Sequence, residues 1–412
     1  MSDHISWIDR RGFVAGGLGT VAGLALPSAA AGAGAGAKPA AGRPRPYLLG
    51  ADISWLPEDE AAGATYRYEG KTWDLLALLR RIGFNAIKVR TFVDPAAAGG
   101  YSADAPAARW AGLERTVALG RRVKAAGFDF TLSLHFSDDW ADPQKQVKPA
   151  AWATMSPAAL AAAVEAYSRR TVAALVAAGA APDMVVVGNE TTFGMMWPEG
   201  RVPLTRPTGN PVTDKTHLDP GRVGGFDGFA ALLKAGIAGA RVAAPGTRIV
   251  LHNHLGRHWP ILRDWTDALR ARDVRFDAIG LSCYQQAAEG DWARSFTEFC
   301  RRYPDLGLLV AEYSSRKRYV NDLVHDLPNG QGWGSFIWEP TRHQEAIFDR
   351  GGRNAGEGPR PNLIAQGLNS AEAPGDGVPA AQRRRTYGVG GQYEGNEFLA
   401  LYRRIASDYG LR

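Results

Sequence analysis

The chain has 412 residues, of which 45% are hydrophobic and 22% charged, which is enough for one large domain or two ordinary ones. Its formal net charge of +6 is small, and the region after the N-terminus has one dense basic block, at 383–385. This balance argues against a nucleic-acid-binding protein. No stretch beyond the N-terminal segment reaches the ~18 apolar residues that a membrane-spanning helix needs. We therefore expect neither nucleic acid nor a membrane as a partner.

The N-terminus has the order of parts found in a bacterial twin-arginine export signal. The pair Arg10-Arg11 and Phe13 precede a weakly apolar stretch at 14–26, and an Ala/Gly run ends in a small-x-small cleavage site at 35–37. A chance arginine pair is the alternative. We expect an export signal at 1–37, a linker at 38–46 and a folded domain at 47–412. The protein would then be exported, to the periplasm or the extracellular space.

After residue 46, short β-rich runs alternate with helical runs. The predicted strands are 48–53, 86–92, 128–135, 184–189, 248–253, 278–284, 307–312 and 335–338. The predicted helices are 73–82, 112–126, 157–178, 226–243, 261–272, 292–303 and 396–408. Alternation of this kind predicts an α/β fold, a single (β/α)8 TIM barrel with right-handed crossovers. Long loops rich in Gly, Pro and Arg follow strand four (197–225) and strand eight (340–395).

Each predicted strand ends in a polar or aromatic residue. These residues are Asp52, Arg90, His135, Asn189 with Glu190, His252, Tyr284, Glu312 and Trp338. Any one of them has a plain structural explanation, such as a strand cap or an internal ion pair. However, the carboxyl ends of all strands of a parallel (β/α)8 barrel meet at one face, where loops and strand ends build the active site. We therefore expect these side chains to lie close together.

Two of the strand ends carry glutamates. The apolar run at 184–187 leads to Glu190, and the run at 308–311 leads to Glu312. Two facing carboxyl groups are the minimal equipment for cleaving a glycosidic bond; a spacing of ~5–5.5 Å gives retention and ~6.5–9.5 Å gives inversion. For Glu312 the alternative is a salt-bridged strand end. The pair indicates a glycoside hydrolase.

Four motifs make the resemblance specific: Gly-Ala-Asp-Ile-Ser at 50–54, the run at 88–95, the run at 135–146, and the segment from Gly188 to Pro198. They resemble glycoside hydrolase family 53, the arabinogalactan endo-β-1,4-galactanases, over most of residues 47–350. The resemblance implies a (β/α)8 barrel of a retaining clan, in which Asn-Glu ends strand four and a Glu ends strand seven. It also implies a catalytic role for the domain at 47–412.

The resemblance implies a role for each site residue. Glu190 would be the acid/base and Glu312 the nucleophile. Asn189 would bind the sugar 2-hydroxyl, Tyr284 would hydrogen-bond the nucleophile, and Arg90 would keep the nucleophile ionised. The remaining positions that match substrate-binding residues are Asp52, His135, Trp140, His252 and Trp338.

Two segments beside the site depart from the family pattern. Tyr284 is followed by Gln-Gln-Ala-Ala at 285–288 instead of a Pro and an aromatic-rich loop, and Glu312 is followed by Tyr-Ser-Ser-Arg at 313–316. We therefore expect a retaining hydrolase that acts on β-1,4-galactan in an endo manner. The alternative is a related β-glycanase or an exo-β-glycosidase with another sugar or linkage preference. A barrel that binds carbohydrate without catalysis is a third reading.

The sequence indicates no catalytic metal or other cofactor. His252 and His254 would share a strand face, which suits chelation, but beyond His258 no further ligand is evident. A structural calcium ion, which occurs in some members of the family, stays open, with 214–219 as a weak candidate loop. Cys283 and Cys300 would lie at opposite ends of one helix, too far apart for a disulfide, so we expect two free thiols. We expect a monomer whose partner is a polysaccharide or oligosaccharide substrate.

Overall fold

The computed structural model describes residues 46–284, 292–341, 346–351 and 390–411, all of which belong to one unit of the chain, Pro44–Arg412. The predicted export signal at 1–37 and most of the predicted linker at 38–46 lie outside the described residues, as does most of the segment after the eighth barrel strand.

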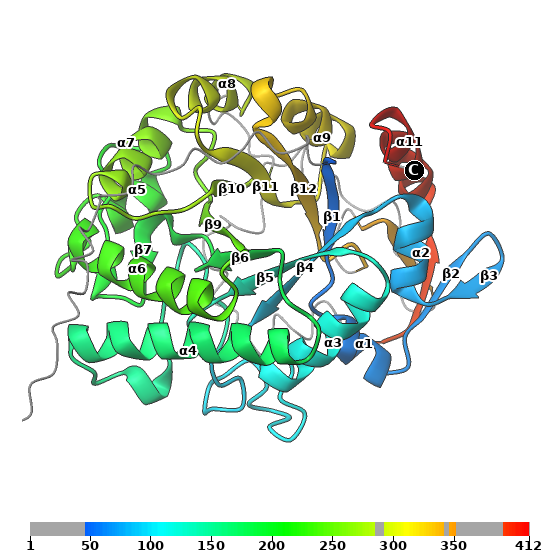
Figure 1. Ribbon diagram of the computed structural model, residues 1–412, viewed down its shortest axis with the longest axis horizontal. Coiled ribbons are helices and arrows are strands. Elements are labelled where there is room, and N and C mark those ends of the chain that lie inside the picture. The colour runs from blue at the N-terminus through cyan, green and yellow to red at the C-terminus, as the bar shows by residue number, and fades with distance from the viewer. Residues whose placement is uncertain (1–45, 285–291, 342–345, 352–389, 412) are drawn as a thin grey trace, which may run out of the picture. The chain divides into compact units, whose positions relative to one another are not determined.

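Eight parallel strands of the described part of the chain close into a barrel in the order β1-β12-β11-β10-β9-β6-β5-β4 (Figure 1). Their bounds are β1 Leu48–Asp52, β4 Ala86–Thr91, β5 Asp129–Leu134, β6 Met184–Val187, β9 Arg248–Asn253, β10 Ala278–Ser282, β11 Gly307–Tyr313 and β12 Gly332–Trp338. Barrel strands that follow one another along the chain also pair with each other, as right-handed β-α-β crossovers require. The predicted TIM barrel is confirmed.

Helices surround the barrel (Figure 1). Their bounds are α1 Leu56–Ala61, α2 Leu75–Ile82, α3 Leu113–Ala125, α4 Pro157–Ala177, α5 Pro211–His217, α6 Gly225–Ala243, α7 Trp259–Arg270, α8 Trp292–Arg302, α9 Lys317–His325 and α11 Glu397–Asp408. Local chemistry fixes several ends: Asp74 and Ser156 cap the first turns of α2 and α4 with their side chains, and Gly83 ends α2 with φ 114°. Helix α9 was not predicted.

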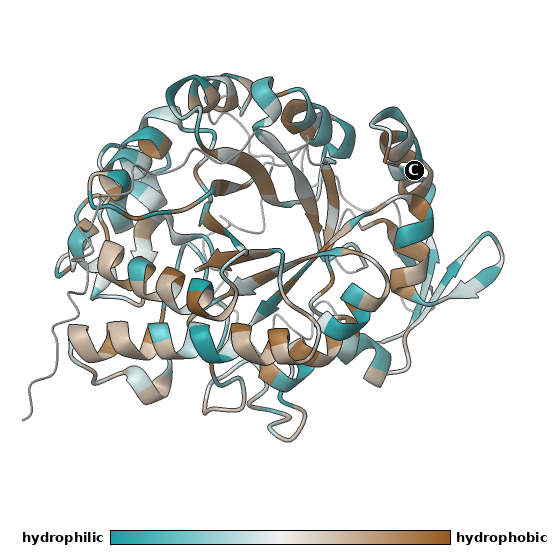
Figure 2. Cartoon of the chain, viewed as in Figure 1, coloured by the Kyte–Doolittle hydropathy of each residue, from teal (hydrophilic) through white to brown (hydrophobic). Residues whose placement is uncertain are grey.

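Burial of apolar strand residues accounts for the core. The strands are rich in Val, Ile and Leu, and β6, for example, is buried along its whole length. In Figure 2 the barrel strands are largely brown, whereas the outer surfaces of the helices carry most of the teal. Strands buried on both faces read as continuous apolar runs rather than alternating ones, which is why the barrel could be recognised from sequence.

A small mixed sheet outside the barrel includes two strands, β13 and β14, from the predicted long loop after strand eight. Its order is β13-β14-β2-β3. The bounds are β13 Phe348–Gly351, β14 Gln392–Gly395, β2 Thr65–Tyr68 and β3 Lys71–Trp73. The predicted loop after strand four is likewise partly ordered, as the short pair β7 Gly194–Met195 and β8 Gly200–Arg201 and helix α5. The pairing of β14 with β2 joins residues more than 300 positions apart, so local patterns could not reveal it.

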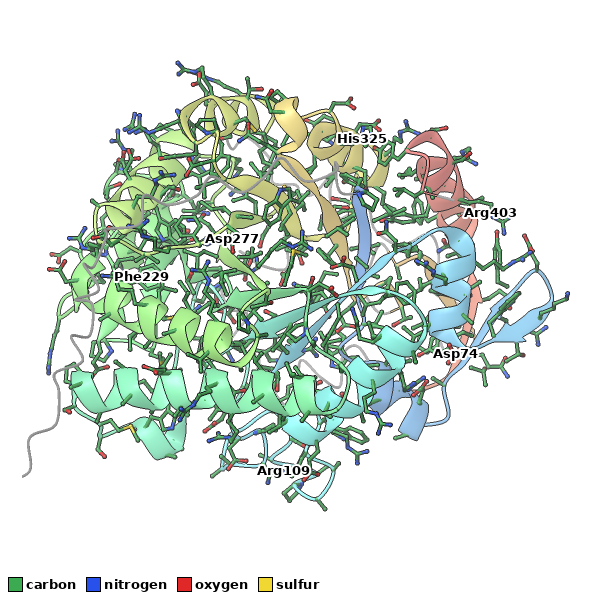
Figure 3. The ribbon with its side chains drawn as sticks, in the orientation of Figure 1. Asp74, Arg109, Phe229, Asp277, His325 and Arg403 are labelled. Carbon is green, nitrogen blue, oxygen red and sulfur yellow. The ribbon has the colours of Figure 1, made fainter. Side chains whose placement is uncertain are left out.

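At the amino ends of the strands, the same kind of side-chain-to-backbone hydrogen bond joins three pairs of neighbouring strands. The residue before each of three strands, Asn85, Asp183 and Asp277, accepts a hydrogen bond through its side-chain oxygen from a backbone N–H of the neighbouring strand, at 2.7–2.8 Å. Asp277, labelled in Figure 3, accepts from Ile249. Polar residues at this end of a TIM barrel serve stability, whereas those at the carboxyl end serve chemistry.

Cys283 and Cys300 are both buried and free, which confirms the prediction of two thiols. No helix that the structure describes combines the length and the apolar character needed to traverse a lipid bilayer.

Candidate active site

The backbone turns sharply where β6 ends, and this turn positions Glu190. Gly188 has φ 84°, and Glu190 has φ 47° and ψ 47°, the left-handed region that non-glycine residues rarely adopt. A Cβ atom at position 188 would lie 2.6 Å from Thr191 Cγ2, so glycine is required there. Left-handed backbone at a non-glycine residue costs about 1–2 kcal/mol. This unfavourable backbone conformation orients the carboxyl group of Glu190.

Glu190 lies among buried polar groups. It is 4% exposed, and the hydroxyl of Ser282, at the end of β10, lies 2.6 Å from its Oε1. Burial, followed by the negative charge of Glu312, raises the pKa of Glu190 well above its usual value. A carboxyl group in this position retains its proton at a pH where an exposed glutamate would be ionised.

Glu312, at the end of β11, is held by donors on both carboxylate oxygens. The ammonium group of Lys88 lies 3.0 Å from Oε1, and the Tyr284 hydroxyl donates to Oε2 at 3.2 Å. Lys88 also donates to the backbone carbonyl of Ala311 at 3.0 Å and lies 3.3 Å from Asp52 Oδ2. Burial disfavours charge on Lys88, but the carboxylates of Glu312 and Asp52 outweigh it and raise the pKa of the lysine. Glu312 is thus the member of the pair that contacts a cation.

The structure corrects the prediction for Arg90. Its guanidinium pairs with Glu339 at 2.7 Å and lies over the rings of Trp140 and Trp55, at 4.1 and 4.8 Å from their centroids. The cation that contacts Glu312 is Lys88, two residues earlier. Arg90 is 1% exposed, so its guanidinium is buried between Glu339 and these rings.

An aromatic cluster lies over Arg90. Trp55 packs edge-on against Trp140 and Trp338, at centroid distances of 5.7 and 5.5 Å, and the last two lie 6.3 Å from each other. Trp55 is buried, whereas Trp140 and Trp338 are partly exposed. Both predicted aromatic positions therefore belong to one cluster whose indole rings are partly open to solvent.

Two buried histidines complete the strand ends. Burial, together with the charges of Arg90 and Lys88, lowers the pKa of His135 well below its usual value, and burial with Lys88 does the same for His252. His135 Nδ1 accepts from the Ala141 N–H at 3.4 Å. His252 contacts Asn189 and Ser282. Both imidazoles are therefore neutral hydrogen-bonding groups.

The structure brings the predicted site residues into one region, although several of them are fully buried. Asp52 is 1% exposed, and its Oδ1 accepts from the Ser54 N–H and hydroxyl while Oδ2 lies beside Lys88. Its part in the site is to hold the lysine. The amide nitrogen of Asn189 donates to the Ala141 carbonyl at 2.9 Å. This hydrogen bond holds the Asn189 side chain in one orientation.

Three residues of the site were missed in the sequence: Lys88, Ser282 and Glu339. Side chains of a strand alternate between two faces, so Lys88 must share a face with Arg90, and Ser282 with Tyr284. That signal was available. Glu339 follows Trp338 directly, but its left-handed backbone, φ 40°, turns it back toward Arg90. No local pattern predicts that turn.

The possible metal ligands are used otherwise. Within the described ranges, no three His, Cys, Asp or Glu side chains are grouped so that they could hold a metal ion. His254 Nδ1 lies 2.7 Å from the Thr192 hydroxyl. In the weak calcium candidate at 214–219, Asp214 accepts from the backbone N–H groups of Thr208 and Gly209.

Comparison with known proteins places this geometry in a family. The model of glycosyl hydrolase family 53 matches residues 48–317. A protein of Niallia circulans described as "Uncharacterized protein in bgaB 5'region" is 34% identical over 330 residues, which cover 72% of this chain and 84% of that protein. The "Probable arabinogalactan endo-beta-1,4-galactanase A" of Aspergillus oryzae is 30% identical over 332 residues, covering 71% and 84%.

A solved structure agrees. The "Ignisphaera aggregans GH53 catalytic domain" superposes with a TM-score of 0.58 at 28% identity and covers 74% of this chain and 88% of that one. The family match spans most of the barrel and includes both strand-end glutamates. The chain is therefore a glycoside hydrolase that belongs to glycosyl hydrolase family 53.

Proposed function

We propose that the protein is a retaining endo-β-1,4-galactanase in which Glu190 is the acid/base and Glu312 the nucleophile. The observation that carries this proposal is the contrast between the two carboxyl groups. Glu190 is buried with a raised pKa, whereas Glu312 is bound by the Lys88 ammonium and the Tyr284 hydroxyl. Two carboxyls whose environments push them toward opposite protonation states are the signature of an acid and a nucleophile.

In the first step, Glu312 attacks the anomeric carbon while the bond from that carbon to the leaving oxygen breaks. Glu190 gives its proton to the leaving oxygen, so the products of the step are a glycosyl ester on Glu312 and an ionised Glu190. Esterification removes the charge of Glu312, which had helped to raise the pKa of Glu190. Glu190 then acts as base toward water, which cleaves the ester with a second inversion.

Galactan is the proposed substrate because relatives of this chain bear the name arabinogalactan endo-β-1,4-galactanase. Trp140 and Trp338 are proposed to stack on sugar rings, and Asn189 and His135 to contact hydroxyl groups. A polysaccharide substrate, a monomeric enzyme and export through the segment at 1–37 form the biological part of the proposal. A related β-glycanase or exo-β-glycosidase is the second candidate, favoured by the departures at 285–288 and 313–316.

A panel of polysaccharides tests the substrate. We expect the protein to release oligosaccharides from β-1,4-galactan much faster than from mannan, xylan or glucan, with the new reducing end initially in the β configuration by NMR. Release of monosaccharide alone from the start would favour exo action. Activity confined to aryl glycosides, or confined to another polymer, would overturn the galactanase proposal and leave the family assignment in place.

Replacing Glu190 with glutamine tests the acid. We expect the rate on galactan to fall by about 10²–10⁴-fold, the usual contribution of general acid–base catalysis. The first step on a dinitrophenyl β-galactoside should lose far less, because that leaving group needs no proton. In the wild-type protein, kcat/KM should decline as pH rises through the elevated pKa of Glu190, and this alkaline decline should vanish in the variant. Equal losses on both substrates would contradict the role.

A further inference from the structure

A chain of hydrogen bonds runs behind Glu190, and this inference rests on the proposed role of that residue. The Ala141 carbonyl receives the Asn189 amide at 2.9 Å, and Asn189 Oδ1 lies 3.1 Å from His252 Nδ1. His252 Nε2 lies 2.9 Å from the Ser282 hydroxyl, which lies 2.6 Å from Glu190 Oε1. Asn189, His252, Ser282 and Glu190 are each at most 4% exposed. These side chains therefore form their hydrogen bonds with one another rather than with solvent.

The Ala141 carbonyl at one end of this row of hydrogen bonds determines which atom of each pair donates. A backbone carbonyl can only accept, so the amide nitrogen of Asn189 faces Ala141 and Oδ1 faces His252. Because Oδ1 also can only accept, Nδ1 of His252 carries a hydrogen. Burial and the nearby Lys88 lower the pKa of His252 well below its usual value, so the ring is neutral and Nε2 carries a lone pair. His252 therefore needs a donor, and Ser282 is the group within reach.

Ser282 has one hydroxyl proton and two neighbours that can take it. While Glu190 holds a proton on Oε1, Glu190 can donate to the oxygen of Ser282, and Ser282 can donate to Nε2 of His252. Both acceptors then have a donor. Once Glu190 is ionised, its carboxylate competes for the serine proton with a charge-assisted bond, which is roughly twice as strong as a neutral one. The two protonation states of Glu190 thus demand opposite orientations of one hydroxyl.

We propose that Ser282 and His252 are positioning residues for Glu190: the serine hydroxyl donates to His252 while Glu190 is protonated, and turns to donate to Glu190 after its proton has left. The turn is a rotation about the Cβ–Oγ bond. The leaving oxygen takes the proton of Glu190, and Ser282 exchanges no proton with either neighbour. One hydroxyl thereby supports a carboxyl group that must act first as acid and then as base.

Other titratable groups face this region from the surrounding elements. Glu312 on β11, Lys88 on β4 and Asp142 after β5 act on Glu190 through their charge, whereas Tyr284 after β10 and His252 on β9 are neutral. The charge effects of Glu312, Lys88 and Asp142 do not pass through Ser282. The test must therefore measure how the effect of His252 depends on the serine.

The experiment is a ¹³C NMR titration of the Glu190 carboxyl in the full chain, with the signal assigned by Glu190→Gln. His252→Phe removes the acceptor that occupies the serine proton and frees it for the carboxylate. We expect this change to lower the titration midpoint of Glu190 by at least about 0.5 pH unit more in the Ser282 background than in the Ser282→Ala background, an estimate from charge-assisted hydrogen-bond strengths. The effect of the apolar ring itself is common to both backgrounds and cancels.

Ser133→Ala is the matched control. Ser133 is a buried serine of β5 whose hydroxyl has no hydrogen-bond partner among the described residues, and its replacement should leave the Glu190 midpoint in place. An equal effect of His252→Phe in both backgrounds would overturn the proposal. If the variants do not fold, neutron diffraction on the wild-type protein decides: the proposal requires a proton on Nδ1 of His252 and a serine hydroxyl directed at Nε2. Both readouts are independent of substrate, so failure of the galactan assay leaves them interpretable.

Discussion

Replacing Glu312 with alanine is expected to lower kcat on galactan by at least about 10³-fold, while the protein stays folded. The variant removes the carboxylate that would form the covalent intermediate, and a loss of 10³ corresponds to about 4 kcal/mol of transition-state stabilisation. Glu312 is 7% exposed and lies at the end of β11, so the shortened side chain leaves the barrel strands unchanged. Steady-state kinetics on galactan measures the loss, and circular dichroism checks the fold.

Added azide makes the result specific to a nucleophile. In Glu312→Ala, azide should enter from the face that the carboxylate occupied and give an α-glycosyl azide. In Glu190→Ala, azide should attack the glycosyl ester from the opposite face and give a β-glycosyl azide. The same anomer from both variants, or turnover near the wild-type rate in Glu312→Ala, would show that the roles are wrongly assigned.

A carboxylate at the other end of the barrel gives the matched control. Asp183 precedes β6, accepts the Phe130 N–H at 2.7 Å and pairs with Lys124 at 2.8 Å. Asp183→Asn should lower the melting temperature modestly and leave kcat near the wild-type value. The contrast between the two ends separates loss of chemistry from loss of stability.

The sequence could indicate which residues meet at the carboxyl end of the barrel because of the geometry of the fold. A buried parallel strand is a continuous apolar run, and its carboxyl end is marked by the first polar residue, as at Asn189 and Glu312. Position along the strand thus encodes position in space. The side sheet, by contrast, depends on the pairing of Thr65–Tyr68 with Gln392–Gly395, for which no local pattern exists.

The choice of partner for each cation could not be predicted in the same way. Lys88 and Arg90 share one face of β4, and either could have been the partner of Glu312. The outcome depends on Glu339, whose left-handed backbone brings its carboxylate to Arg90 at 2.7 Å. Lys88 is then left between Asp52 and Glu312. Sequence gives the charges and the face, but three-dimensional distances decide which pairs form.

Replacing Lys88 with methionine is expected to have the second large effect. Methionine keeps most of the volume of the side chain but removes a cation that contacts both Glu312 and Asp52. Breaking a buried pair leaves an uncompensated charge, at a cost of about 3–5 kcal/mol. Glu312 should avoid that cost by holding a proton up to a higher pH, and a protonated carboxyl is no nucleophile.

The pH profile shows this directly. For the wild-type protein, kcat/KM falls on the acidic side as the nucleophile takes up a proton. In Lys88→Met this acidic limb should move upward by at least about 1 pH unit, since a change of 1.4 kcal/mol in the balance of the two protonation states moves a midpoint by one unit. Lys88→Arg keeps the charge and should leave the limb near its wild-type position, although the wider guanidinium will lower kcat.

The double variant Lys88→Met/Asp52→Asn distinguishes a direct effect on Glu312 from a general disturbance of the pocket. Removing the Asp52 carboxylate eliminates one of the two negative charges that Lys88 balanced, so part of the upward shift should be reversed. If the lysine only fills space, Lys88→Met will keep the wild-type acidic limb, and the second substitution will change nothing. If the limb moves up and then partly back, the lysine acts through its charge, as its raised pKa between two carboxylates requires.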